Sequence, residues 1–295
     1  MVIFVKKSNQ LLTIIPGEIP ISELHGLLLS SVAPRPIALA STMDGNGEPN
    51  LSPFSFFNVF SANPPILIFS PARRVRDNTV KHTLENVRET GEVVINVVTY
   101  DMVHQTSLAS TEYGRGVNEF LKAGFTMLPS ETVKPFRVAE SPVQFECKVI
   151  EVKELGTEGG AGNLVICQVL RMHVEERVLN SQGKIDQRKL DLVARAGGNF
   201  YSRAREAFFE IPKPLSSQGI GVDGLPESVR NSKVLTGNEL GMLGNVERLP
   251  ERDAVDKFIK DNPRLMGADL NEKHKFAQSF LQRDDVESAW KVLLS

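Results

Sequence analysis

Cysteine and histidine are scarce in this sequence, which has 2 Cys and 5 His among 295 residues. The two cysteines, Cys147 and Cys167, fall on two expected strands that would pair as a hairpin. That pairing leaves the thiols about four residues out of register, which is too far apart for a disulfide. We expect no metal site, because no two histidines have the spacing of metal ligands; they are His25, His82, His104, His173 and His274.

Long apolar runs and an excess of either charge are also missing. No apolar stretch approaches the ~20 residues that cross a bilayer, and 34 basic residues nearly balance 36 acidic ones, for a net charge of −2. This balance argues against a sequence-independent nucleic-acid binder. The first seven residues place their lysines after the apolar stretch, the reverse of a secretory signal. We therefore expect a cytoplasmic protein without a membrane or nucleic-acid partner.

The common nucleotide and hydrolase signatures are absent as well. The sequence has no P-loop, no complete G-x-G-x-x-G and no G-x-S-x-G elbow. Its first part instead shows short apolar strands with turn signals and few helices, which is typical of a β-barrel or sandwich. We expect one helix over residues 80–91 and strands over residues 36–42, 50–60, 66–70, 93–98, 143–152 and 164–174.

The C-terminal part has a different pattern. Residues 216–250 are rich in Gly, Asn and Pro, which predicts a linker that wraps the surface of the β domain. Helices are expected over residues 251–260, 271–282 and 284–294, and Asp269 with Glu272 forms a capping box. The prediction is a mainly β domain over residues 1–215, followed by a linker and helical extension over residues 216–295.

Residues 50–58 (NLSPFSFFN) combine three aromatic side chains with small polar ones. A planar heteroaromatic ligand needs apolar faces and a few fixed hydrogen-bonding groups, which this stretch could supply. The alternative is a strand that buries alternate phenylalanines and turns its Ser and Asn residues to solvent.

Residues 70–83 (SPARRVRDNTVKHT) gather three arginines, a lysine and several hydroxyl or amide groups where a strand ends and a helix begins. Free N–H groups at a helix start and cationic side chains together suit a phosphate. The alternative is a solvated basic loop with ordinary capping of the helix by Asn78 or Thr79.

Several motifs, in order over roughly residues 20–212, resemble those of the flavin reductase-like family. They are residues 34–42 (PRPIALAST), 50–58, 63–65 (NPP), 81–87 (KHTLENV), 89–96 (ETGEVVIN), 116–120 (GVNEF), 123–126 (AGFT) and 197–201 (GGNFY). The resemblance implies an FMN-binding split barrel, which is a Greek-key antiparallel β-barrel. It also implies a homodimer with FMN near the subunit interface.

Matching positions carry the family's cofactor contacts onto this chain. Those expected to line the flavin ring and ribityl chain are Ser41, Thr42, Ser52, Pro53, Phe54 and Ser55. Lys81, His82 and Thr83 match a Lys-Asp-Thr phosphate element, with His82 in place of the usual Asp. Because the preceding loop is longer than in the family, further phosphate contacts are expected from Ser70, Arg76, Asp77, Asn78 and Thr79.

The resemblance implies a flavoprotein oxidoreductase that takes hydride from NADH or NADPH and passes electrons to oxygen, a partner oxygenase or a bound substrate. No acid–base pair is visible, and His104 is the single catalytic candidate, with a surface position as the alternative. Two other functions stay open: an FMN-binding electron carrier or redox sensor without steady turnover, and a structural protein that has lost flavin.

Overall fold

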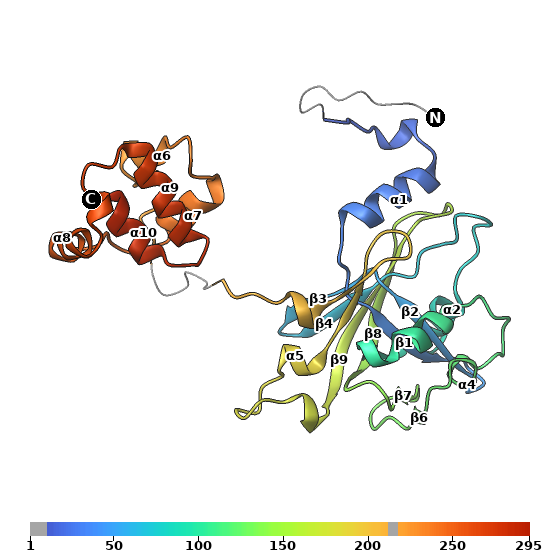
Figure 1. The fold of residues 1–295 in the computed structure, drawn as a ribbon. Helices are drawn as coiled ribbons and strands as arrows, with labels where there is room; N and C mark the ends of the chain where they lie inside the picture. Colours follow the sequence, from blue (N-terminus) through green and yellow to red (C-terminus); the bar gives the residue numbers. More distant parts are fainter. Residues whose placement is uncertain (1–10, 212–217) are drawn as a thin grey trace. The chain divides into compact units, whose positions relative to one another are not determined.

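The computed structural model describes residues 11–211 and 218–295. The chain divides into two compact units, Met1–Phe208 and Phe209–Ser295 (Figure 1). The charge pattern noted in the first seven residues lies outside the described part. In the described residues, no helix is both long and apolar enough to pass through a bilayer.

The first unit is built on one antiparallel sheet of seven strands, in the order β2-β1-β5-β8-β9-β4-β3. Their bounds are β1 Ala38–Met43, β2 Pro49–Phe54, β3 Phe57–Ala62, β4 Pro65–Phe69, β5 Glu92–Val97, β8 Val143–Glu154 and β9 Asn163–Val174. The strands expected from the sequence are confirmed, with one correction. The stretch 50–60 forms two strands instead of one. The chain bends at Ser55 and Phe56, so that β2 before the bend pairs with β1 and β3 after it pairs with β4.

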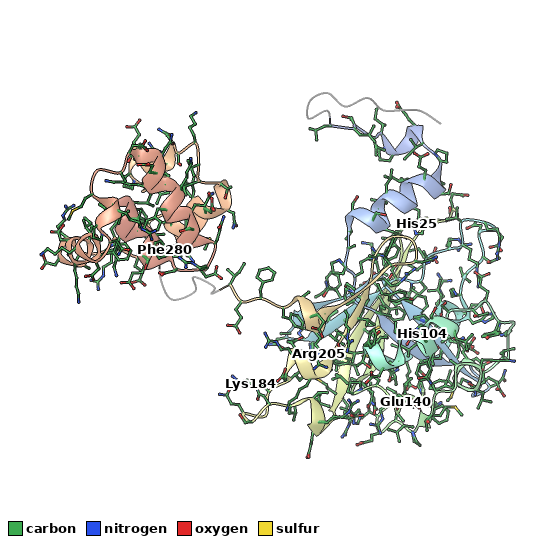
Figure 2. The ribbon with its side chains drawn as sticks, viewed as in Figure 1. His25, His104, Glu140, Lys184, Arg205 and Phe280 are labelled. Atoms are coloured by element: carbon green, nitrogen blue, oxygen red, sulfur yellow. The ribbon has the colours of Figure 1, made fainter. Side chains whose placement is uncertain are left out.

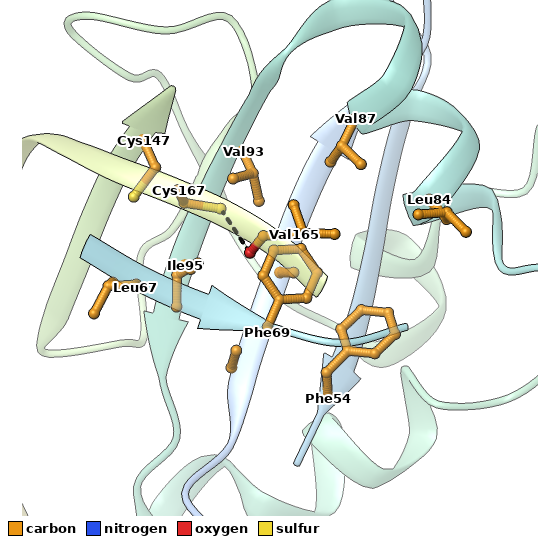
Figure 3. Close-up of a cluster of buried hydrophobic side chains, with 12 residues drawn as sticks. Phe54, Leu67, Phe69, Leu84, Val87, Val93, Ile95, Cys147, Val165 and Cys167 are labelled. Atoms are coloured by element: carbon orange, nitrogen blue, oxygen red, sulfur yellow. Dashed lines mark hydrogen bonds between the residues drawn. The ribbon is translucent and has the colours of Figure 1, made fainter. Parts of the chain in front are cut away.

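The sheet curls around a hydrophobic core, and alternate residues of six of its strands fill this core. Phe54 of β2 and Phe69 of β4 meet there with ring centroids 5.3 Å apart, beside Leu84 of the following helix (Figure 3). Helix α2 (His82–Thr90) packs on β1 and β2 and ends at Gly91, which adopts φ 69°. That left-handed conformation is the usual helix stop, as the sequence predicted.

Both cysteines are free and buried in this core (Figure 3). Cys147 lies opposite Val169, not residue 171, because a bulge follows Glu146. The offset between the thiols is therefore smaller than expected. Burial raises the pKa of Cys147 to about 12 and also raises that of Cys167, so both thiols stay protonated and unreactive.

Short elements cover the outer face of β1, β2 and β5, where Leu39 and Leu51 pack beneath α3 and α4. The remaining elements of this unit are α1 Ile21–Ser31, α3 Val103–Leu108, α4 Glu119–Ala123, α5 Gln187–Leu190, β6 Met127–Leu128, β7 Arg137–Val138, β10 Val193–Arg195 and β11 Tyr201–Arg203. Single-turn 3-10 helices lie at Pro16–Glu18, Tyr100–Met102, Glu176–Val178 and Ala204–Ala207.

A buried carboxylate fixes the segment between β6 and β7 to the barrel. Glu146 of β8 accepts hydrogen bonds from the Glu131 N–H (2.9 Å), the Thr132 N–H and hydroxyl, and His173 Nε2 (2.7 Å). Burial by itself would raise the Glu146 pKa, but these hydrogen bonds outweigh it and lower the pKa to about 2. His173 is thus one of the partners that keep Glu146 ionised.

The second unit has helices α6 Glu227–Arg230, α7 Gly237–Gly244, α8 Arg252–Asp261, α9 Leu270–Leu281 and α10 Val286–Leu293, with a 3-10 turn at Pro263–Leu265. The last three helices and the Asp269–Glu272 capping box are confirmed. The linker expected over residues 216–250 is wrong for its described part. That stretch holds α6 and α7, and its Leu225, Val229 and Leu243 pack with Trp290 in the unit's own core.

Candidate functional site

A cavity of about 490 Å³ opens beside the edge strand β2. Its wall comes from the end of β2, from α3 and from the β10–β11 hairpin, through Ile37, Pro53, Ser55, Thr106, Ser107, Ser110, Arg195, Asn199 and Tyr201. This volume falls within the ~300–1,000 Å³ typical of small-molecule sites. Two of the expected flavin contacts, Pro53 and Ser55, are among the residues that form the wall.

Alternation along β2 separates the other expected contacts from this cavity. Pro53 faces the same side as Leu51, which packs beneath α3 and α4, whereas Phe54 faces the barrel interior and is 8% exposed. Ser52 points with Phe54, because side chains two apart in a strand share a face. Of the aromatic stretch, Phe54 is buried but Phe56 is 39% exposed, so neither sequence interpretation describes all of it.

A buried polar network ties β1, β2, α2 and α4 together where α2 begins. The Glu119 carboxylate accepts from the Leu51 N–H at 3.0 Å and from Asn50 Nδ2 at 3.1 Å. The Asn50 carbonyl oxygen accepts from the Thr83 hydroxyl at 2.8 Å and from the Thr42 hydroxyl at 3.4 Å. Thr42 and Thr83 therefore act as internal hydrogen-bonding groups that fix the start of α2 against β2.

Ser41 lies beside this network on β1 and is fully buried. Its hydroxyl has no hydrogen-bond partner among the described residues. A buried hydroxyl without a partner is uncommon and costs stability. The hydroxyl of Thr106, which lines the cavity, is a second buried hydroxyl without a partner among the described residues.

The start of α2 carries a cation without a capping side chain. Lys81 is the N-cap residue, and no side chain accepts from the first helical N–H groups. Capping by Asn78 or Thr79, which was part of the alternative of a solvated basic loop, is therefore wrong. Burial and, to a lesser degree, the charge of Arg74 lower the Lys81 pKa. Within the described ranges, no carboxylate lies within 4.0 Å of its ammonium group, so the site favours an anion.

The positive charges of the loop before α2 are largely neutralised by ion pairs with nearby carboxylates. Arg74 and Arg76 both bind Glu112, each at 2.8 Å. Asp77 accepts from the Thr79 hydroxyl at 2.6 Å and from its N–H, which lowers the Asp77 pKa to about 2. The predicted contacts Arg76, Asp77 and Thr79 are exposed and bound to one another or to Glu112, which leaves Lys81 as the cation best placed for a ligand.

Two further predicted residues hold the loop in place. The Ser70 hydroxyl is buried and accepts from the Asn163 N–H at 3.1 Å. Asn78 accepts from Arg73 Nε at 2.6 Å and donates to the Thr157 carbonyl at 3.0 Å, which ties the loop to the β8–β9 turn. His82 is half-buried at the first position of α2.

The Flavin reductase like domain family matches residues 29–189 of the sequence. The chain belongs to this family. The resemblance inferred from the motifs is thus confirmed, and it spans the whole seven-stranded sheet. A flavin reductase-like protein is expected to take part in flavin-linked redox chemistry.

Relatives and solved structures agree with this assignment. An uncharacterized protein of Halalkalibacterium halodurans is 36% identical over 205 residues, which is 69% of this chain and 97% of that protein. Nitrilotriacetate monooxygenase component B of Bacillus cereus superposes with a TM-score of 0.64 at 28% identity, over 70% of this chain and all of that one. A split-barrel protein of Shewanella frigidimarina superposes with a TM-score of 0.57 at 25% identity, over 67% and 95%. The expected split barrel is therefore confirmed.

Sequence reasoning missed part of the cavity wall. The hydroxyl groups of α3 and the side chains Arg195, Asn199 and Tyr201 line the cavity although none was expected there. The motif at residues 197–201 was the available signal for the hairpin. His104 lies on α3 but is exposed and is not part of the cavity wall (Figure 2).

Proposed function

We propose that this protein binds FMN and catalyses NAD(P)H-dependent flavin reduction. The observation that carries the proposal is the pairing of Lys81, a half-buried cation at an uncapped helix start, with a cavity beside the same edge strand. A ligand with a phosphate at one end and a planar ring at the other matches this arrangement.

The residues present fit such a cofactor. Lys81 and the free N–H groups of His82 and Thr83 would hold the phosphate, since cations and a helix dipole act there together. Pro53 and Ser55 would contact the ring, and Thr106 supplies a buried hydroxyl that lacks a partner in the described part of the chain. The flavin supplies the hydride-accepting chemistry when bound.

The chain's own contribution is to position the reactants and exclude water. Hydride transfer needs the two rings close together, which a preformed cavity favours. No acid–base side chain is required, and the exposed His104 lies outside the residues that form the cavity wall. We infer that the protein passes electrons to oxygen, a partner oxygenase or a small substrate.

We infer a homodimer with the flavin site near its interface. Apolar side chains are exposed on the two strands that flank β4: Val59 and Phe60 of β3 are each 64% exposed, and Leu170 and Met172 of β9 are 47% and 45% exposed. Clustered exposed apolar residues are typical of interfaces. Light scattering of the FMN-loaded protein should give twice the mass of the chain, and a monomeric mass would refute the dimer.

Flavin titration followed by stopped-flow reduction tests the proposed activity. The protein should bind one FMN per chain, and NADH or NADPH should bleach the flavin absorbance within a catalytic turnover. Bound FMN that neither nucleotide reduces would favour the electron carrier or sensor instead. Absence of any FMN binding would overturn the proposal.

A further inference from the structure

The cavity has a cationic wall that the flavin phosphate site does not explain. Arg195, at the end of β10, is half-buried, donates to the Phe200 carbonyl at 3.2 Å and stacks on the Tyr201 ring at 4.6 Å. In the part of the chain that the structure describes, no carboxylate lies within 4.0 Å of its guanidinium. Arg203 on the same hairpin differs, since it pairs with Asp191, with Nε 2.9 Å from Oδ1.

A second guanidinium lies behind Arg195. Arg35 is 7% exposed and exchanges two backbone hydrogen bonds of 2.8 Å with Arg195. Among the described residues, its guanidinium donates only to carbonyl groups, those of Leu29, Val32 and Ala196. Burial, and then the charge of Arg195, lower the Arg35 pKa. Two close positive charges without a carboxylate are unfavourable unless an anion joins them.

The rest of the wall suits an anion as well. Thr106 is 1% exposed and its hydroxyl has no partner within residues 11–211 and 218–295, while Ser107, Ser110 and Asn199 add further hydrogen-bonding groups. None of the nine described residues that line the cavity is acidic, and Ile37 with Pro53 offers an apolar surface. Such a wall combines oxyanion recognition with room for a ring.

We propose that Arg195 recognises a carboxylate or phosphate group on the molecule that exchanges electrons with the flavin. This inference takes the position of the flavin from the proposed function. It adds the class of substrate, which is a small organic anion. The shared chemistry is an oxyanion bound by the Arg195 guanidinium. Its source is either the carboxylate of a ring-containing substrate or a phosphate of the nicotinamide dinucleotide.

Calorimetric titration of the FMN-loaded protein tests the inference with benzoate, its neutral analogue benzamide, and NADP⁺. FMN content is first read from the flavin absorbance, so a failure to bind flavin is recognised separately from a failure to bind the anion. We expect an oxyanion to bind, and Arg195→Gln to weaken it roughly 10–100-fold, as for the loss of one charge-assisted hydrogen bond. Arg195→Lys should restore part of the affinity.

Arg203→Gln is the matched control, because Arg203 also stacks on a tyrosine, Tyr100 at 3.8 Å, but already has a carboxylate partner. Its anion affinity should stay unchanged. A loss confined to benzoate supports a carboxylate substrate, and a loss confined to NADP⁺ supports the dinucleotide phosphate. Equal binding of benzoate and benzamide, together with unchanged NADP⁺ affinity in Arg195→Gln and Arg195→Lys, would overturn the proposal.

Discussion

Replacement of Lys81 by methionine should separate phosphate recognition from folding. Methionine keeps an unbranched chain of similar length but removes the charge at the start of α2. A hydrogen bond from a charged group contributes about 1.5–3 kcal/mol, so FMN affinity should fall roughly 10–100-fold. Riboflavin lacks the phosphate, and its affinity should not change.

The stability of the flavin-free protein should move in the opposite direction. Burial, followed by the charge of Arg74, lowers the Lys81 pKa below its ordinary value of 10.5, so the folded state disfavours the charged form. Since the unfolded chain binds this proton more tightly, the charge reduces stability at pH 7, and the reduction disappears only as the pH approaches 10.5. Lys81→Met should therefore raise the free energy of unfolding at pH 7.

Fluorescence titrations with FMN and riboflavin, and urea unfolding of the flavin-free protein, measure both effects. Lys122→Met is the control, because Lys122 is exposed and its ammonium lies 5.7 Å from the Tyr113 ring, away from the start of α2. It should leave both flavin affinities unchanged. Equal losses for FMN and riboflavin, or a lower free energy of unfolding for Lys81→Met, would refute the reasoning.

Three further predictions concern the rest of the molecule. Glu146→Gln should lower the free energy of unfolding by about 3 kcal/mol at pH 7, because the Glu146 pKa is about 2 folded against 4.5 unfolded. This difference should shrink as the pH falls from 4.5 toward 2 in urea unfolding; a difference independent of pH would contradict it. His104→Ala should change flavin reduction by much less than the ~10²–10⁴-fold of an acid–base residue in stopped-flow measurements, and a fall above about a hundredfold with intact FMN affinity would be contrary evidence. A chain that ends at residue 211 should fold and bind FMN, since residues 218–295 build their own core. In contrast, a chain that ends at Pro250 should expose that core. If the chain that ends at residue 211 is soluble but binds no flavin, the expectation is wrong.

Local patterns in the sequence were sufficient for most of the barrel. Alternation and turn residues predicted the strands, and Gly91 predicted the end of α2, because these signals act over a few residues. The helices α6 and α7 were missed because glycine and proline obscured their periodicity, although Thr236 and Glu239 form a capping box there. That motif was the available signal.

The remainder of the site depends on pairings that local patterns do not encode. Arg195 reaches the cavity because its backbone pairs with Arg35, far away in the sequence. Alternation along β2 sends Ser52 and Pro53 to opposite faces. Which of the two faces adjoins the cavity depends on α3 and the β10–β11 hairpin, which come later in the chain. The loop arginines were expected to bind phosphate, but the partner that neutralises two of them, Glu112, follows α3 in the chain and gave no local signal.

The hydrogen bond from Leu51 to Glu119 also has a consequence for aggregation. β2 is an edge strand, and the outward N–H groups of an edge can template pairing with a strand of another molecule. The Glu119 carboxylate accepts the hydrogen bond of the Leu51 N–H, which is then not free to pair with another strand. The Thr42–Asn50 hydrogen bond joins directly opposed residues of β1 and β2. A one-residue slip of β2 would separate this pair and leave buried polar groups unsatisfied. The same few side chains thus select one strand register and cap an edge that would otherwise promote intermolecular β-pairing.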